Sequence, residues 1–205
     1  MIASHTRSGF TLIELLVVIA IIAILAIVVI LTLNPGQLIM QARDSNRISD
    51  LATIKSAIGY YLQDTVLPNL GTSGRCYTDA PKYQNAVATT TCPWFAVATT
   101  INASTSRSVD GTGWVPVILS GLTIGSPIGQ WPTDPLNVTG HAGGAFATST
   151  DFFYSYAASS TSVGGFKLGA NLESQKYRYG GPSDVESKDG GTYPDAYEQG
   201  TNLQL

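Results

Sequence analysis

The chain has 205 residues, and its 11 lysines and arginines against 14 aspartates and glutamates give a formal net charge of −3. The basic residues are scattered and form no stripe, so no nucleic-acid-binding surface is evident. Only two histidines occur, and His141, the one beyond the N-terminal segment, stands in a Gly-rich stretch with no catalytic motif around it. We therefore expect no enzymatic activity.

A long apolar segment lies near the N-terminus. Residues 15–31 form an unbroken apolar run, and residues 10–33 contain only Thr11, Glu14 and Thr32 as polar residues. A hydrocarbon core of roughly 30 Å takes about 20 helical residues to cross, so this segment is predicted to be a transmembrane helix. An ionised glutamate in such a helix costs at least about 2.5 kcal/mol, so Glu14 calls for a functional explanation.

Two ordinary explanations compete for this segment. A cleavable secretory signal has a shorter apolar centre of about 7 to 15 residues and ends in small residues, which residues 34–37 do not provide. We therefore expect the helix to be retained. A plain signal anchor remains an alternative, in which His5 and Arg7 are cytoplasmic flanking charges. It leaves Glu14 and the Gly9-Phe10 junction unexplained.

The sequence Gly-Phe-Thr-Leu-Ile-Glu-Leu-Leu-Val-Val at residues 9–18 resembles the N-terminal signature of type IV pilins and type II secretion pseudopilins. The resemblance implies that a membrane-embedded prepilin peptidase and methyltransferase cleaves the chain after Gly9 and methylates the new amino terminus at Phe10. It also implies a subunit that an inner-membrane assembly platform polymerises with copies of itself or with minor pilins.

Glu14 lies four residues after Phe10, about one helical turn away. Cleavage after Gly9 would create an ammonium group at Phe10, and this group could pair with Glu14 of the same chain or of a neighbouring subunit. Removing one partner of a buried ion pair typically costs about 3–5 kcal/mol, so an intersubunit pair would favour one axial offset between subunits. We predict that Glu14 is an assembly residue.

The chain is predicted to have four parts. They are a leader (1–9), a transmembrane and filament-core helix (10–33), an amphipathic helix (34–66) and an exported globular head (67–205). Pro35-Gly36 is expected to kink or break the helix between its apolar and amphipathic halves.

The amphipathic helix is predicted from spacings of three and four residues between the members of one face. That face comprises Leu38, Ala42, Ile48, Leu51, Ala52, Lys55, Ile58 and Leu62. Intervening positions are filled by Arg43, Asp44, Asn46, Arg47, Asp50 and Gln63.

The head changes to a composition rich in Gly, Ser, Thr and aromatic residues. Strands are predicted at 114–122, 152–157 and 165–172, because these runs are apolar or alternating and are bounded by turn residues. A long helix packed on a small antiparallel sheet is an α+β arrangement, which is also the pilin-like fold that the resemblance implies.

Cys76 and Cys92 both fall between the helix and the predicted strands. An exported head would experience oxidising conditions, which favour a disulfide between them. Closing a loop of this size contributes about 3 kcal/mol in the chain-entropy model. A metal site at these two cysteines is disfavoured, because such a site would need further ligands.

Residues 131–137, Trp-Pro-Thr-Asp-Pro-Leu-Asn, resemble the Pro-x-Asp-Pro turn that precedes the sheet in major pseudopilins and many pilins. Residues that precede proline avoid the helical region, so this segment is predicted to be a rigid turn that directs the chain into the sheet.

The C-terminal tail combines carboxylates with glycines. Major pseudopilins bind calcium in a C-terminal loop, and oxygen ligands on a flexible turn suit that ion. The resemblance therefore makes a calcium site conceivable, with Asp184, Asp189 and Asp195 as candidate ligands. No ligand spacing of the EF-hand type is present.

Three functions remain open. The first is a type IV pilus-like subunit, which the paired cysteines favour. The second is a type II secretion pseudopilin, which the Asp-Pro turn and the acidic tail favour. The third is a bitopic anchored binding protein with an uncut N-terminus. The first two place the chain in the bacterial inner membrane with the head exported, and then in a surface or periplasmic filament.

Overall fold

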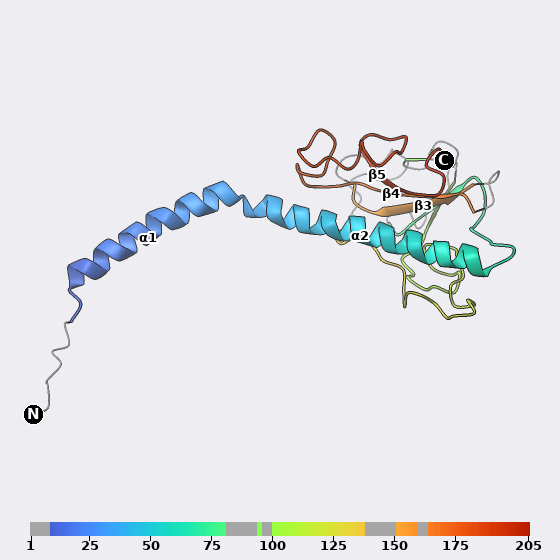
Figure 1. The fold of residues 1–205 in the computed structure, drawn as a ribbon, viewed down its shortest axis with the longest axis horizontal. Helices are drawn as coiled ribbons and strands as arrows, with labels where there is room; N and C mark the ends of the chain where they lie inside the picture. The colour runs from blue at the N-terminus through green and yellow to red at the C-terminus, as the bar shows by residue number, and fades with distance from the viewer. Residues whose placement is uncertain (1–8, 81–93, 96–99, 138–150, 160–163) are drawn as a thin grey trace, which may run out of the picture. The chain divides into compact units, whose positions relative to one another are not determined.

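The computed structural model of the protein contains two long helices and a five-stranded sheet (Figure 1). The residues that the structure describes are 9–80, 94–95, 100–137, 151–159 and 164–205. The chain divides into two units, Met1–Ile39 and Met40–Leu205. The second unit, which adds residues 40–66 to the predicted head of 67–205, is called the head from here on.

The helices are α1, Leu12–Leu33, and α2, Pro35–Asp64. Between them Asn34 adopts the left-handed conformation with φ 41°, which asparagine tolerates better than most residues. Pro35 occupies the first position of α2, where a backbone donor is not needed. The predicted helix break at Pro35-Gly36 is thus present.

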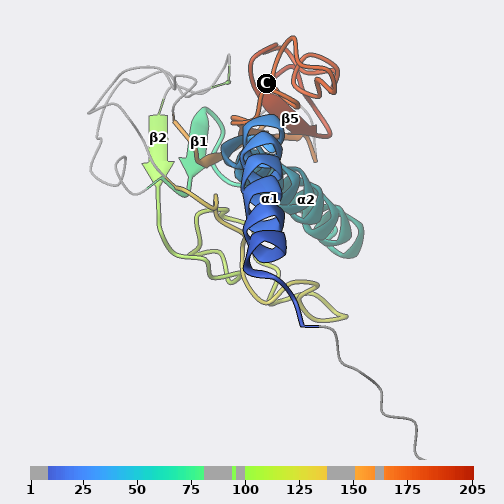
Figure 2. The same cartoon turned by 90° about the vertical axis from the view of Figure 1, so that its left-hand side faces the viewer.

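The sheet has the strand order β2-β1-β3-β4-β5. All neighbouring strands are antiparallel except β1 and β2, which Figure 2 shows as adjacent arrows pointing the same way. The predicted α+β fold, a helix on a small, mostly antiparallel sheet, is therefore confirmed. The strands are β1 Arg75–Thr78, β2 Thr100–Ala103, β3 Tyr154–Ala158, β4 Phe166–Ala170 and β5 Tyr197–Gly200.

The core of the head lies between α2 and the sheet. Aromatic side chains of β3 and β4 pack against a stripe of α2 residues that recur every three or four positions: Leu51, Ile54, Ala57, Ile58 and Tyr61. The sequence pattern placed Leu38, Ala42 and Ala52 on the same face, but all three are exposed. The buried residues of α2 lie on the side of the helix that carries Ile54 and Tyr61, because the side chains on that side contact the sheet.

Of the three predicted strands, 152–157 and 165–172 correspond to β3 and β4. The prediction for 114–122 is wrong, since within the described part of the chain this segment forms no strand and pairs only through an isolated bridge between Asp110 and Ile118. Most of its apolar residues are nevertheless buried, with Ile118 the exposed exception, and the Trp114 indole donates to Pro132 O at 2.9 Å. In this segment the alternation of apolar and polar residues results from partial burial of a loop and not from pairing with a neighbouring strand.

Arg47 of α2 is completely buried and is surrounded by carboxylates. Its Nε and Nη2 donate to both Asp134 oxygens at 2.7 and 3.0 Å, and its Nη1 contacts Asp44 Oδ1 at 2.8 Å and Glu173 Oε1 at 2.5 Å. The guanidinium also lies over the Phe152 ring at 4.8 Å. The amphipathic pattern put Asp44 and Arg47 on the polar side of the helix, but the structure buries both.

A second carboxylate, Asp79, joins the predicted Asp-Pro turn to the sheet. Asp79 follows β1, and its two oxygens accept from the backbone amides of Asp134 and Tyr154, each at 2.8 Å. Asp134 itself accepts from Leu136 N at 2.8 Å. The turn is therefore held on one side by α2 and on the other by the beginning of β3.

We expect Arg47→Met to destabilise the head by about 3–5 kcal/mol, because the substitution leaves buried carboxylates without their counter-charge. Urea unfolding followed by the fluorescence of the buried Trp114 and Trp131 measures this loss. Ser49→Ala, on the exposed side of α2, is the matched control and is expected to change little. A loss below about 1 kcal/mol for Arg47→Met would contradict the assigned role.

Asp79 gives the head a pH-dependent stability. Burial raises its pKa to about 7, against the opposing effect of the two amide bonds. Since the folded state binds the proton more tightly than the unfolded chain does, the Asp79 contribution falls as the pH rises from about 4 to about 7. Unfolding free energies across that range should show this slope, and Asp79→Asn should flatten it. An equal slope in the variant would rule out Asp79 as its source.

Candidate processing and assembly site

The first turn of α1 is closed by a reciprocal capping box. Thr11, at the N-cap, has extended backbone angles, and its hydroxyl accepts from Glu14 N at 3.3 Å. Glu14 Oε2 in turn accepts from Thr11 N at 2.9 Å and from the Thr11 hydroxyl at 2.7 Å. These bonds satisfy two amides that the helix itself leaves unpaired.

From the sequence, Glu14 was considered only as a charged group that pairs with the Phe10 ammonium, and this cap was not predicted. The signal was present, since Thr-x-x-Glu before an apolar run is the pattern of a capping box. In the uncut chain, the carboxylate is thus already fixed at the start of the helix. It contacts Thr11, the residue that immediately follows Phe10.

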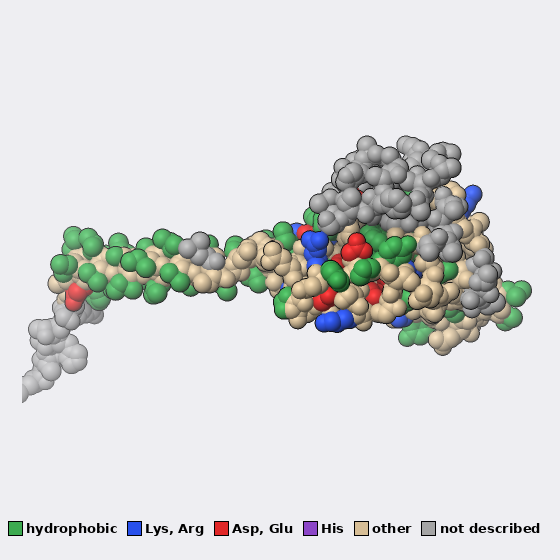
Figure 3. All heavy atoms as spheres, turned by 90° about the horizontal axis from the view of Figure 1, so that it is seen from above, with side chains coloured by type: hydrophobic (Ala, Val, Ile, Leu, Met, Phe, Trp, Pro, Cys, Tyr) green, Lys and Arg blue, Asp and Glu red, His purple; other side chains and the backbone are tan. Residues whose placement is uncertain are grey.

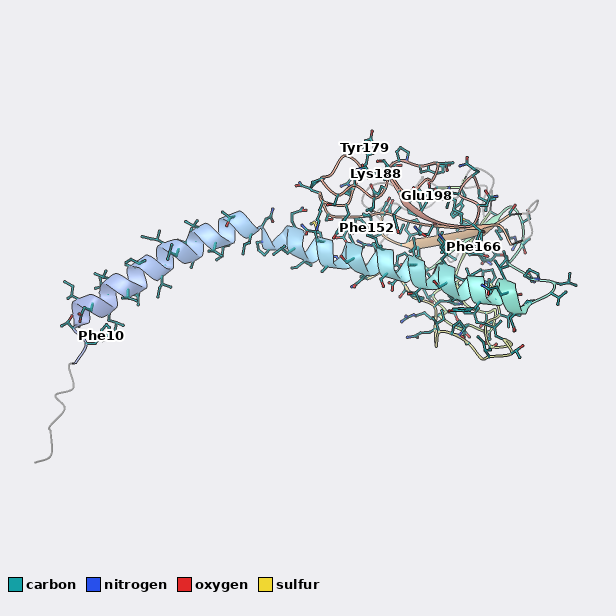
Figure 4. The ribbon with its side chains drawn as sticks, in the orientation of Figure 1. Phe10, Phe152, Phe166, Tyr179, Lys188 and Glu198 are labelled. Atoms are coloured by element: carbon teal, nitrogen blue, oxygen red, sulfur yellow. The ribbon has the colours of Figure 1, made fainter. Side chains whose placement is uncertain are left out.

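The Gly9-Phe10 junction is open to its surroundings. The Phe10 side chain is 80% exposed, and no atom lies within 4 Å of the position that a Cβ on Gly9 would take. Figure 4 labels Phe10 just before the first turn of α1. In the described structure, nothing covers the bond that the leader prediction marks for cleavage.

Helix α1 is apolar on all sides. Among the side chains of α1 that the structure describes, the large apolar ones are between 46% and 82% exposed, and Figure 3 shows hydrophobic groups along the helix. A helix of this kind requires a membrane or a bundle of like helices around it. The segment Leu12–Ile30 is long and apolar enough to cross a membrane.

Residues 4–30 match the family model described as the prokaryotic N-terminal methylation motif. The chain carries a prepilin-type methylation motif. This finding implies processing by a prepilin peptidase and, together with the apolar helix, indicates anchoring in the inner membrane before export. Proteins with the motif are typically structural and not enzymatic. Comparisons of the chain with curated proteins and with solved structures found no match.

Two predictions in the head depend on residues outside the described part of the chain. Cys76 is fully buried in β1, but Cys92 lies in the segment 81–93, which the structure does not describe. The Cys76–Cys92 disulfide therefore stays a prediction. His141 likewise lies outside the described residues.

The three candidate calcium ligands, Asp184, Asp189 and Asp195, all lie among the described residues, and a calcium site formed by them stays a prediction. No group of three or more His, Cys, Asp or Glu residues among those described is arranged to hold a metal ion. Asp184 accepts from Gly180 N at 2.9 Å and from Ser187 N at 3.0 Å.

Other carboxylates of the tail make the same kind of contact. Asp189 accepts from the amides of Gly191 and Glu198 at 2.7 and 2.5 Å, and Glu186 accepts from those of Leu172 and Tyr179 at 3.0 and 2.8 Å. These side chains thus replace the ladder bonds that an irregular segment lacks.

Proposed function

We propose that the protein is the structural subunit of a type IV pilus-like filament, stored in the membrane by α1 and polymerised through it. The observation that carries the proposal is an all-round apolar helix that bears the methylation motif and holds one carboxylate in its first turn. The partners are further copies of the chain or minor pilins, the prepilin peptidase and the inner-membrane assembly platform.

Glu14 supports this role because its position is already defined before processing. Its carboxylate reaches the amide of Thr11 at 2.9 Å, so an ammonium created at Phe10 would arise one residue away from an existing contact. In the apolar surroundings of packed helices, a carboxylate is strongly favoured to find a cationic partner. A neighbour's Phe10 ammonium supplies that partner and sets the offset between subunits.

A type II secretion pseudopilin is the second candidate. It is favoured by the Asp-Pro turn, which the contacts of Asp134 with Arg47 and Asp79 fix in the head. Both candidates share cleavage, membrane storage and polymerisation. They differ in whether the filament reaches the cell surface or stays in the periplasm.

We expect the chain from membranes and from sheared surface fractions to begin at N-methylated Phe10. N-terminal mass analysis of both fractions measures this directly. An intact Met1 would overturn the proposal and favour a bitopic anchored protein. Processed chain that never enters the sheared fraction would favour the pseudopilin instead.

Glu14→Ala should insert into the membrane and be cleaved, but it should form at least about 100-fold less filament, because an unpaired ammonium remains among packed helices. Quantitative blotting of the sheared fraction measures filament yield. Thr11→Ala is the matched variant, since it removes the capping partner and keeps the carboxylate. If Thr11→Ala lost as much filament as Glu14→Ala, the role of Glu14 would be capping and not subunit pairing.

A further inference from the structure

Lys167 of β4 carries a side chain that is completely buried in the head. In the antiparallel register Lys167 lies opposite Gly200 and Gly169 lies opposite Glu198, so Lys167 and Glu198 are diagonal neighbours on β4 and β5. Long side chains can meet across such a diagonal. Figure 4 labels Glu198 and Phe166, the residue before Lys167, on the sheet.

The Lys167 amine is enclosed by specific contacts. Its Nζ forms an ion pair with Glu198 Oε1 and donates to Thr192 Oγ1 at 2.9 Å and to Leu205 O at 3.1 Å. The rings of Phe95 and Tyr193 lie 5.5 and 4.9 Å from it. The amine therefore points at one carboxylate from inside a partly aromatic enclosure.

The Glu198 carboxylate is held just as firmly. Oε2 accepts from Tyr193 N at 3.1 Å, and the Glu198 amide donates to Asp189 Oδ2 at 2.5 Å. Among the described residues Oε1 has no hydrogen-bond partner of proper geometry, so its contact is the ion pair with Nζ. A side chain on Gly191 would overlap this carboxylate, so the glycine provides its space.

These conditions favour reaction between the two groups. Burial lowers the pKa of Lys167, against the opposing effect of Glu198, and thereby increases the fraction of uncharged, nucleophilic amine. Condensation of an amine with a carboxylate is unfavourable in water, but well-oriented groups in one molecule reach effective molarities of about 10⁵ M or more. A fully buried amide is also shielded from hydrolysis.

We propose that Lys167 and Glu198 form a covalent amide cross-link between β4 and β5. Nζ first transfers one proton to Glu198 Oε1, and the lone pair that this frees attacks Glu198 Cδ. The bond from Cδ to Oε1 then breaks, Oε1 takes a second proton from Nζ and leaves as water, and the third proton stays on the amide nitrogen. The charges of the ion pair cancel, and no oxidant or cofactor is needed.

The cross-link would close the chain between residues 167 and 198, which includes most of the irregular tail. The tail otherwise depends on hydrogen bonds of single carboxylates, such as those of Asp184. A covalent tie would therefore keep it attached to the sheet when the head is pulled or partly unfolded.

The test is peptide mapping of the full-length protein, extracted from membranes, reduced and denatured before digestion with trypsin. We expect no cleavage after Lys167, and we expect the peptides that contain Lys167 and Glu198 to be joined, with a total mass lower by one water. Separate, unmodified peptides from the wild-type chain would overturn the proposal, whether or not Phe10 proves to be processed.

Two variants refine this test. Lys167→Arg keeps the charge but is not nucleophilic, so its peptides should separate. Lys55→Arg is the matched control, because Lys55 donates to Gln199 Oε1 at 3.0 Å, beside Glu198, and should leave the cross-link intact. If Lys167→Arg does not fold, the wild-type map alone decides. Joined peptides in a folded Lys167→Arg protein would also contradict the assignment.

Discussion

The head depends on the buried guanidinium of Arg47. This one side chain binds Asp134 through two nitrogens and also contacts Asp44 and Glu173, so it connects α2, the Asp-Pro turn and the segment after β4. Buried charges are costly unless they are paired and hydrogen-bonded, so each carboxylate must stay in place for the others to remain favourable. The network thus fixes one arrangement of α2, the Asp-Pro turn and the segment after β4. Apolar packing alone would allow these elements to shift against one another.

Asp79 extends this constraint to the sheet. By accepting from the amides of Asp134 and Tyr154, it fixes the turn against the first residue of β3. The helix that continues from the membrane segment is therefore tied to the sheet by polar contacts near one end of the interface and by the Leu51–Tyr61 stripe along the rest.

Local patterns predicted the methylation motif, the helix break at Pro35, and strands β3 and β4, because each is set by residues close together in sequence. The Arg47 network could not be predicted in this way. Its partners Asp134 and Glu173 lie 87 and 126 positions away, and only the fold shows that they meet. Strand β5 was not predicted, because Glu198 and Gln199 are of residue types that usually lie on the surface. The cap formed by Thr11 and Glu14 could have been predicted from the Thr-x-x-Glu pattern, but it was not.

The tail after β4 has an unusual basis for its order. Its turns are closed by Asp184, Glu186 and Asp189, which accept from main-chain amides where a strand partner would otherwise do so. Each turn is thus encoded by its own carboxylate and not by the neighbouring strand. Substitution of one of these carboxylates should consequently disturb its own turn and leave the sheet beneath it unchanged.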